Sequence, residues 1–182
     1  MRGPPHYYVG LLSAAALHGA AHQQPQEFQI VTDKQLRPTG AGRSRLRFFL
    51  KRDAGRTRTE ERRTDTGMMR LSTPESTAYD LVRYSTALGG LSAVATVLAE
   101  LADKLEPNHL VREASEVELA VIQRTGYLLD HVGATDKTDA LGAWLAARRP
   151  RRALLRADVG RGPEEADKRW AIIPNEAIEV DE

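Results

Sequence analysis

The sequence offers one pair of residues at metal-ligand spacing, His18 and His22. On a continuous helix, side chains four residues apart share a face, so the two imidazoles could hold a metal ion together. No third ligand lies nearby in the chain, and Gly19 weakens a helix between them. Imidazoles near a helix C-terminus also hydrogen-bond the last carbonyls and complement the helix dipole. We therefore expect structural histidines, no bound metal and no cofactor.

Hydroxyl and carboxyl groups gather over residues 72–80 in a pattern typical of a helix start. In STPESTAYD, Ser72 and Glu75 form a capping box, and Pro74 lies in the first turn, where its missing N–H costs nothing. Asp80 belongs to a scatter of acidic residues typical of a solvated helix face. No nucleophile accompanies a base in the sequence, and the absence of Cys excludes thiol catalysis, disulfides and Cys-ligated zinc. We predict a protein that is not an enzyme.

Arginines give a more informative signal. Arg43, Arg45 and Arg47 alternate with Leu46 and Phe48, so a strand here would have one basic face and one core face. Guanidinium groups suit phosphate recognition. Three interpretations stay open: contact with nucleic acid or another anion, contact with an acidic protein, and simple solubility. The candidate contact residues are Arg43, Arg45, Arg47, Lys51, Arg52, Arg56, Arg58, Arg62, Arg63, Arg148, Arg149, Arg151 and Arg152.

The formal net charge of +1 conceals a segregation of charge along the chain. Residues 34–70 contain twelve Lys or Arg and four Asp or Glu, a balance of +8, whereas residues 71–146 contain five basic and eleven acidic residues, a balance of −6. Such blocks produce local potentials of several kT. No apolar run reaches ~18 residues, so we expect no membrane-spanning helix and no membrane partner. The lack of Cys is compatible with a reducing cytoplasm, where we expect the protein.

The first half of the chain predicts one helix followed by strands. Residues 7–21 are rich in Leu and Ala and predict a buried helix. They form a poor signal-peptide core, because Arg2 is the only charge before them. Alternation of apolar and polar residues predicts strands over 27–32, 45–52 and 67–72, with a further strand near 58–63. In the second of these strands, Leu46, Phe48 and Leu50 should face the core.

The second half predicts helices and then strands. The capped helix that begins at Ser72 should bury Leu81 and Val82. Further helices are predicted over 91–105, 108–112, 116–131 and 138–148, and strands over 151–158 and 168–180. This order predicts an α+β fold, with a small, mainly antiparallel sheet packed with a helical subdomain. We expect residues 1–6 to be a leader or linker remnant and residues 7–182 to form one domain.

Five blocks in order carry a resemblance to a known family: YYVGLLSAAALHGAAHQQPQEFQIVT, GRSRLRFFL, RLSTPESTAYDLVRY, ELAVIQRTGYLLDHVG and WAIIPNEAIEV. Together they resemble the C-terminal domain of the AbiEi antitoxins of bacterial type IV abortive-infection toxin–antitoxin systems. The resemblance runs from about Tyr7 to Val180. It implies an antitoxin that counteracts a nucleotidyltransferase-like toxin encoded by the adjacent gene, in a cytoplasmic phage-defence system.

The resemblance also implies regulation of the operon, through a winged helix-turn-helix that precedes this domain in the family. That module has no counterpart in this sequence, so we expect position 1 to fall about where the linker ends. Antitoxicity is attributed to the C-terminal domain and is retained in this interpretation. We expect a monomer that makes at most weak contact with DNA or RNA. The alternative is a stand-alone transcriptional regulator that binds nucleic acid.

Overall fold

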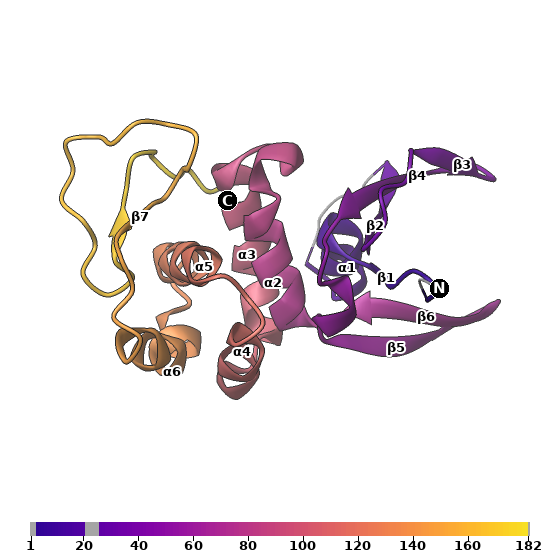
Figure 1. The fold of residues 1–182 in the computed structure, drawn as a ribbon, viewed down its shortest axis with the longest axis horizontal. Coiled ribbons are helices and arrows are strands. Elements are labelled where there is room, and N and C mark those ends of the chain that lie inside the picture. The colour runs from indigo at the N-terminus through magenta and orange to yellow at the C-terminus, as the bar shows by residue number, and fades with distance from the viewer. Residues whose placement is uncertain (1–2, 21–25, 182) are drawn as a thin grey trace.

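The computed structural model describes residues 3–20 and 26–181 and divides into a sheet half and a helical half (Figure 1). The sheet has six strands in the order β3-β4-β2-β1-β6-β5. Pairs β1–β2, β3–β4 and β5–β6 are antiparallel, whereas β1–β6 and β2–β4 are parallel. The strands are β1 (Tyr7–Val9), β2 (Glu27–Thr32), β3 (Thr39–Ala41), β4 (Ser44–Leu50), β5 (Thr59–Thr64) and β6 (Gly67–Ser72).

The helical half follows the sheet and is joined to it by packing around α2. Helix α1 lies between the sheet and α2, so that it contacts both β2 and α2 (Figure 1). A two-stranded parallel sheet, β7–β8, packs against α5 at the far end. These elements are α1 (Leu11–Leu17), α2 (Pro74–Arg83), α3 (Leu91–Leu101), α4 (Pro107–Ala114), α5 (Leu119–His131), α6 (Thr135–Ala146), β7 (Ala153–Leu154) and β8 (Ile172–Ile173). The expected α+β class with a mainly antiparallel sheet is confirmed.

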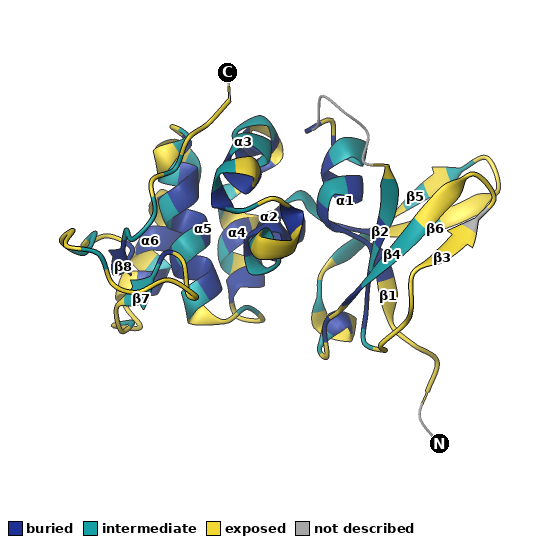
Figure 2. Ribbon diagram, turned by 90° about the horizontal axis from the view of Figure 1, so that it is seen from above, coloured by how far each residue is buried: buried dark blue, intermediate teal, exposed yellow. Residues whose placement is uncertain are grey.

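One apolar core runs through both halves (Figure 2). It begins on the sheet with Tyr8, Val31 and Phe49 and continues into the helices, where Leu81 and Val82 are buried as predicted. Burial of a Leu or Val side chain stabilises a fold by about 1.5–3 kcal/mol, so this shared core holds the two halves together. Among the described residues, no helix has the length and apolar character needed to span a bilayer.

The first predicted helix is wrong at its start. Tyr7–Val9 forms β1 in the middle of the sheet, and the helix begins only at Leu11. The break follows from a close approach at Gly10, where a Cβ would lie 2.8 Å from Val31 Cγ2. Leu11 then takes a positive φ of 54°, which turns the chain into α1. The end of the predicted segment, including His22, lies outside the described residues.

The predicted faces of β4 are also reversed. Phe49 is buried, whereas Leu50 is 46% exposed, so the core lies on the side of Phe49 and Lys51. Parallel pairing of Val31 with Phe49 places these two residues on the face that α1 covers. Because apolar residues occur on both faces of RLRFFL, alternation alone did not select the correct face. The segment before β4, predicted as a loop, also contains the short strand β3.

The helix after β6 begins one residue later than predicted. Thr73 is the N-cap, and its Oγ1 accepts a hydrogen bond from the Ser76 amide at 3.1 Å. Ser72 remains in β6, paired with Thr59. Glu75 Oε1 instead accepts a hydrogen bond from the Glu106 amide at 2.8 Å and so caps α4. The C-terminal strands are shorter than predicted, with two residues each.

Candidate functional site

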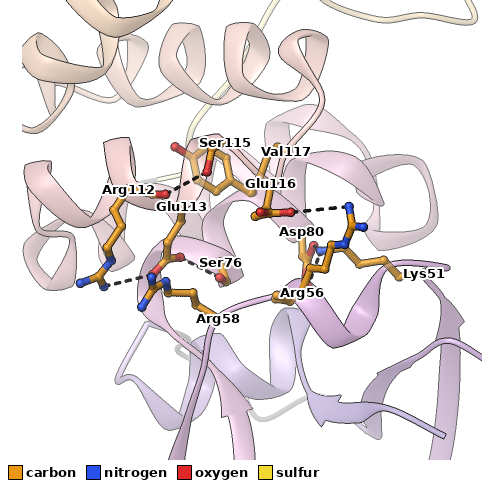
Figure 3. Close-up of a pocket in the computed structure, with 12 residues that line it drawn as sticks. Lys51, Arg56, Arg58, Ser76, Asp80, Arg112, Glu113, Ser115, Glu116 and Val117 are labelled. Carbon is orange, nitrogen blue, oxygen red and sulfur yellow. Dashed lines mark hydrogen bonds and ion pairs between the residues drawn. The ribbon is translucent and has the colours of Figure 1, made fainter. Parts of the chain in front are cut away.

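A cleft of about 320 Å³ lies where the sheet half meets the helical half (Figure 3). One wall comes from the 3₁₀ turn and loop before β5, and the other from α2, α4 and the loop after α4. Its charged and hydroxyl lining residues are Lys51, Arg56, Thr57, Arg58, Ser76, Tyr79, Asp80, Arg112, Glu113, Ser115 and Glu116. The cleft is therefore polar, and it brings together side chains from segments that are far apart in the sequence.

The cleft is built on a buried ion pair. Lys51 Nζ lies 2.9 Å from Asp80 Oδ1, and both residues are almost fully buried. Lys51 also donates to Thr57 Oγ1 at 2.8 Å, and the Tyr8 hydroxyl donates to Asp80 Oδ2 at 2.5 Å. Burial, together with the Asp80 carboxylate, raises the pKa of Tyr8 far above its usual range, so the phenol stays protonated. These contacts fix α2 to β1 and β4.

A second buried carboxylate, Glu113, lies deeper along the same wall. It accepts hydrogen bonds from Ser76 Oγ at 2.7 Å and from Thr73 Oγ1 at 2.9 Å. Burial raises the pKa of Glu113, and the two hydroxyl donors offset part of this effect. Arg112 Nη2 is 3.7 Å from Glu113 Oε1, and Figure 3 shows the Arg58 guanidinium close to the same carboxylate.

The rim of the cleft carries three exposed arginines. Arg56 lies 4.0 Å from Glu116, whereas Arg58 and Arg112 lie beside Glu113. Solvent-exposed ion pairs of this kind contribute only ~0–1 kcal/mol, so a ligand can replace them at small cost. Arginine forks bind carboxylates and phosphates with two parallel hydrogen bonds. The geometry thus suits recognition of an anionic group at the rim, above buried charges that hold the wall in place.

The predicted basic residues are divided among separate places. Arg56 and Arg58 line the cleft, but Lys51 is buried in the ion pair and does not contribute to a basic surface. Arg43 and Arg45 are exposed on the β3–β4 hairpin. Strand β4 is separated from β5 by three strands in the sheet order, so the single patch expected from alternation does not form.

Several of the other predicted contact residues have structural partners. Arg47 lies over the Phe49 ring at 4.7 Å and 3.9 Å from Glu27. Arg62 Nη1 donates to the Leu17 carbonyl at 2.6 Å. Arg148 stacks on Trp144 at the opposite end of the molecule, where Arg149, Arg151 and Arg152 are exposed (Figure 1). Arg52 and Arg63 are exposed on the turn after β4 and on β5.

The histidine expected to cap a helix has a different partner. His18 is buried, and its Nε2 lies 2.8 Å from the Ser72 carbonyl of β6, not from a carbonyl of its own helix. Its Nδ1 lies 3.9 Å from Glu60. Over residues 3–20 and 26–181, no three His, Asp or Glu side chains are grouped closely enough to hold a metal ion.

The residues that sequence reasoning missed are Tyr8, Asp80 and Glu113. Asp80 was assigned to a solvated helix face, but it is 1% exposed and bound to two partners from the sheet. One local signal could have identified it: Lys51 shares a strand face with the core residue Phe49, and a buried cation requires a carboxylate partner. Nothing in the sequence indicates which carboxylate is the partner.

Comparisons with known proteins agree with this architecture. Residues 8–131 match the family model described as AbiEi antitoxin C-terminal domain. The fold is similar to the crystal structure of the RV2827C protein from Mycobacterium tuberculosis, with a TM-score of 0.63 and 17% sequence identity. The match covers 92% of this chain and 61% of the mycobacterial chain. At this identity the likeness shows the fold alone. No curated protein matches the sequence.

Proposed function

The chain belongs to the family of AbiEi antitoxin C-terminal domains, and from this premise we propose that it neutralises a nucleotidyltransferase toxin encoded by the neighbouring gene. The match over residues 8–131 carries the proposal, because it includes the whole sheet and every wall of the cleft. The role proposed is binding without catalysis, in the cytoplasm, as part of a type IV system that acts against phage. The chain spans 61% of the mycobacterial chain that shares its fold, so functions of a longer protein remain proposals.

The contacts within the cleft support a binding role. Its hydroxyl groups on Ser76 and Thr73 are already donated to Glu113, and the Tyr8 hydroxyl is donated to Asp80. A nucleophilic hydroxyl needs a nearby base that removes its proton, whereas burial raises the pKa of Glu113 and disfavours its charged form. Recognition of an anionic group by Arg56, Arg58 and Arg112 is the chemistry that these side chains favour.

Growth rescue tests the antitoxin proposal. The neighbouring gene is expressed from an inducible promoter, and this chain is expressed from a second plasmid. We expect colony counts to fall on toxin induction and to recover when the chain is co-expressed. A matched control is the Leu81→Asp variant, which places a charge in the core and should remove rescue through unfolding. A toxic neighbour that the stable wild-type chain does not oppose would contradict the proposal.

A second function, contact with nucleic acid and a share in operon regulation, is favoured by one observation. Residues 34–52 contain seven Lys or Arg and no Asp or Glu, and Arg43 and Arg45 in this segment are exposed. Phosphate contact of this kind is electrostatic, with affinities of about 10⁻⁴–10⁻⁶ M and a salt slope near −0.9 per phosphate neutralised. A salt series on duplex DNA with wild type and Arg43→Glu/Arg45→Glu tests it. Tight, sequence-specific binding by the double variant would contradict it.

A further inference from the structure

The two hairpins of the sheet form an open cradle on the side away from the helices. Both the β3–β4 hairpin and the β5–β6 hairpin project beyond the helical half, and the N-terminal end of the described chain lies between them (Figure 1). A hollow of about 580 Å³ lies at the foot of the β5–β6 hairpin and extends over β1 and β2. We use the name cradle for this hollow together with its continuation over the adjacent face of β4.

The floor of the cradle is apolar. Register places Val9, Ile30 and Phe48 side by side on one face of β1, β2 and β4, opposite the face that carries Val31 and Phe49 into the core. Tyr7, Phe28, Leu46 and Leu50 follow on the same face at two-residue spacing. Tyr7 is 60% exposed, and Met68, which lines the hollow, is 61% exposed. This face is therefore an apolar surface that no helix of the described chain covers.

Exposed apolar side chains are concentrated on this half of the molecule. Four of the seven large hydrophobic residues that are exposed in the described chain belong to the sheet half: Tyr7, Leu36, Leu50 and Met68. Single exposed hydrophobics are common on proteins, but a contiguous apolar face with a concave shape marks an interaction site. The other exposed hydrophobics, Leu119, Val159 and Val180, are scattered over the helical half.

Charge around the cradle is asymmetric. The β3–β4 side carries only cations: Lys34, Arg37, Arg43 and Arg45 are exposed, and residues 34–52 include no acid. The β5–β6 side is mixed, because Arg63 and Arg70 alternate with Glu61 and Asp65. A partner that fits must therefore be apolar at its centre and acidic along the edge that meets the β3–β4 side.

The mixed β5–β6 side favours a protein over a nucleic acid. A single-stranded nucleic acid carries phosphates along its whole length and would be repelled by Glu61 and Asp65 on one side of the cradle. A second copy of this chain would bring two cationic β3–β4 hairpins together and is disfavoured for the same electrostatic reason. Methionine and aliphatic side chains also suit an apolar protein segment, since they adapt to irregular surfaces.

We propose that the cradle binds the toxin directly, through an apolar segment of the toxin whose β3–β4 edge bears carboxylates. This inference rests on the proposed antitoxin function and adds the surface and the chemistry of contact. The apolar centre supplies affinity, and the acidic edge fixes the orientation of the segment and speeds association through attraction to Arg37 and Arg43.

Binding of the full chain to the purified toxin tests the proposal by titration calorimetry. Met68→Asp removes apolar contact from the floor, and Leu119→Asp is its control, an equally exposed type of side chain in the helical half. Arg37→Glu/Arg43→Glu reverses the β3–β4 charge, and Arg151→Glu/Arg152→Glu is the matched reversal at the far end. We expect each cradle variant to weaken binding at least tenfold and each control to stay within twofold, while all four keep the wild-type melting temperature.

Other outcomes separate this proposal from the antitoxin function. Wild-type binding that the cradle variants leave unchanged overturns the cradle but not the antitoxin role. A chain that rescues growth without binding the toxin also overturns the cradle, and it means that the toxin is opposed through its target. A chain that neither binds nor rescues overturns both. Sensitivity of single-stranded RNA binding, but not toxin binding, to Met68→Asp would assign the surface to nucleic acid and overturn a protein partner.

Discussion

Removing the cation of the buried ion pair is the most direct test of how the sheet is fixed to the helices. In Lys51→Met the stem of the side chain is kept, and Asp80 loses the ammonium group at 2.9 Å. Tyr8 still donates to the carboxylate, but Arg83 Nε is 4.0 Å away and Arg83 is already paired with Glu118. A buried carboxylate that loses its partner costs about 3–5 kcal/mol. This loss is a large part of a total stability of roughly 5–15 kcal/mol.

Urea titration followed by circular dichroism measures the loss. Arg52→Met is a matched control, since it changes the next residue in the chain, which is exposed, and we expect a change within about 0.5 kcal/mol. Lys51→Met/Asp80→Leu removes both charges and should cost less than Lys51→Met alone, because no charge is left buried without a partner. Equal stability of Lys51→Met and wild type would refute the claim that this pair holds the two halves together.

The remaining predictions concern the helical half and the cleft. Leu81→Ala should cost about 2–5 kcal/mol in a denaturant titration, since Leu81 is fully buried. Gly126→Ala should lower the melting temperature despite the better helix propensity of Ala, because its Cβ would lie 2.1 Å from Trp170 Cζ3 and overpacking costs about 1–3 kcal/mol. The pKa of Glu113 is raised in the folded state, so its contribution to stability is present at low pH and is lost as pH rises from the usual carboxyl value through the raised one; unfolding titrations from pH 4 upward should show a shallower decline for Glu113→Gln. Chelation with EDTA should leave the melting temperature unchanged if His18 is structural, and tightly held zinc in tag-free protein would contradict this.

Local patterns identified the elements whose side chains follow one clear period. Strands β2 and β6 and helix α5 were predicted close to their observed bounds, since their apolar residues alternate or recur at helical spacing. Strand β1 was not predicted, because Leu and Ala continue from it into α1 without a change in composition. Its strand conformation comes from pairing with Thr32 to Ile30 and with Leu71, contacts that depend on distant parts of the chain.

The cleft was hidden from sequence reasoning for a similar reason. Tyr8 and Asp80 are 72 residues apart, and Lys51 and Asp80 are 29 apart, so no spacing rule connects them. The basic segment around Arg45 was visible as a composition, because charge can be counted along the chain. Its division into hairpin, cleft and far-end groups follows from sheet order, which composition does not encode.

The position of β1 has a consequence for biosynthesis. The first strand to leave the ribosome lies in the middle of the sheet, between β2 and β6, and its pairing with β6 joins Val9 to Leu71. Contacts of such separation form slowly, because a long loop must close first. The nascent chain can thus form β1–β2–β4 early, but β6 and α2 must emerge before Tyr8 meets Asp80. Until then the apolar side chains of β1 and α1 have no covering helix, and we expect this stage to be the one at which a chaperone binds the growing chain.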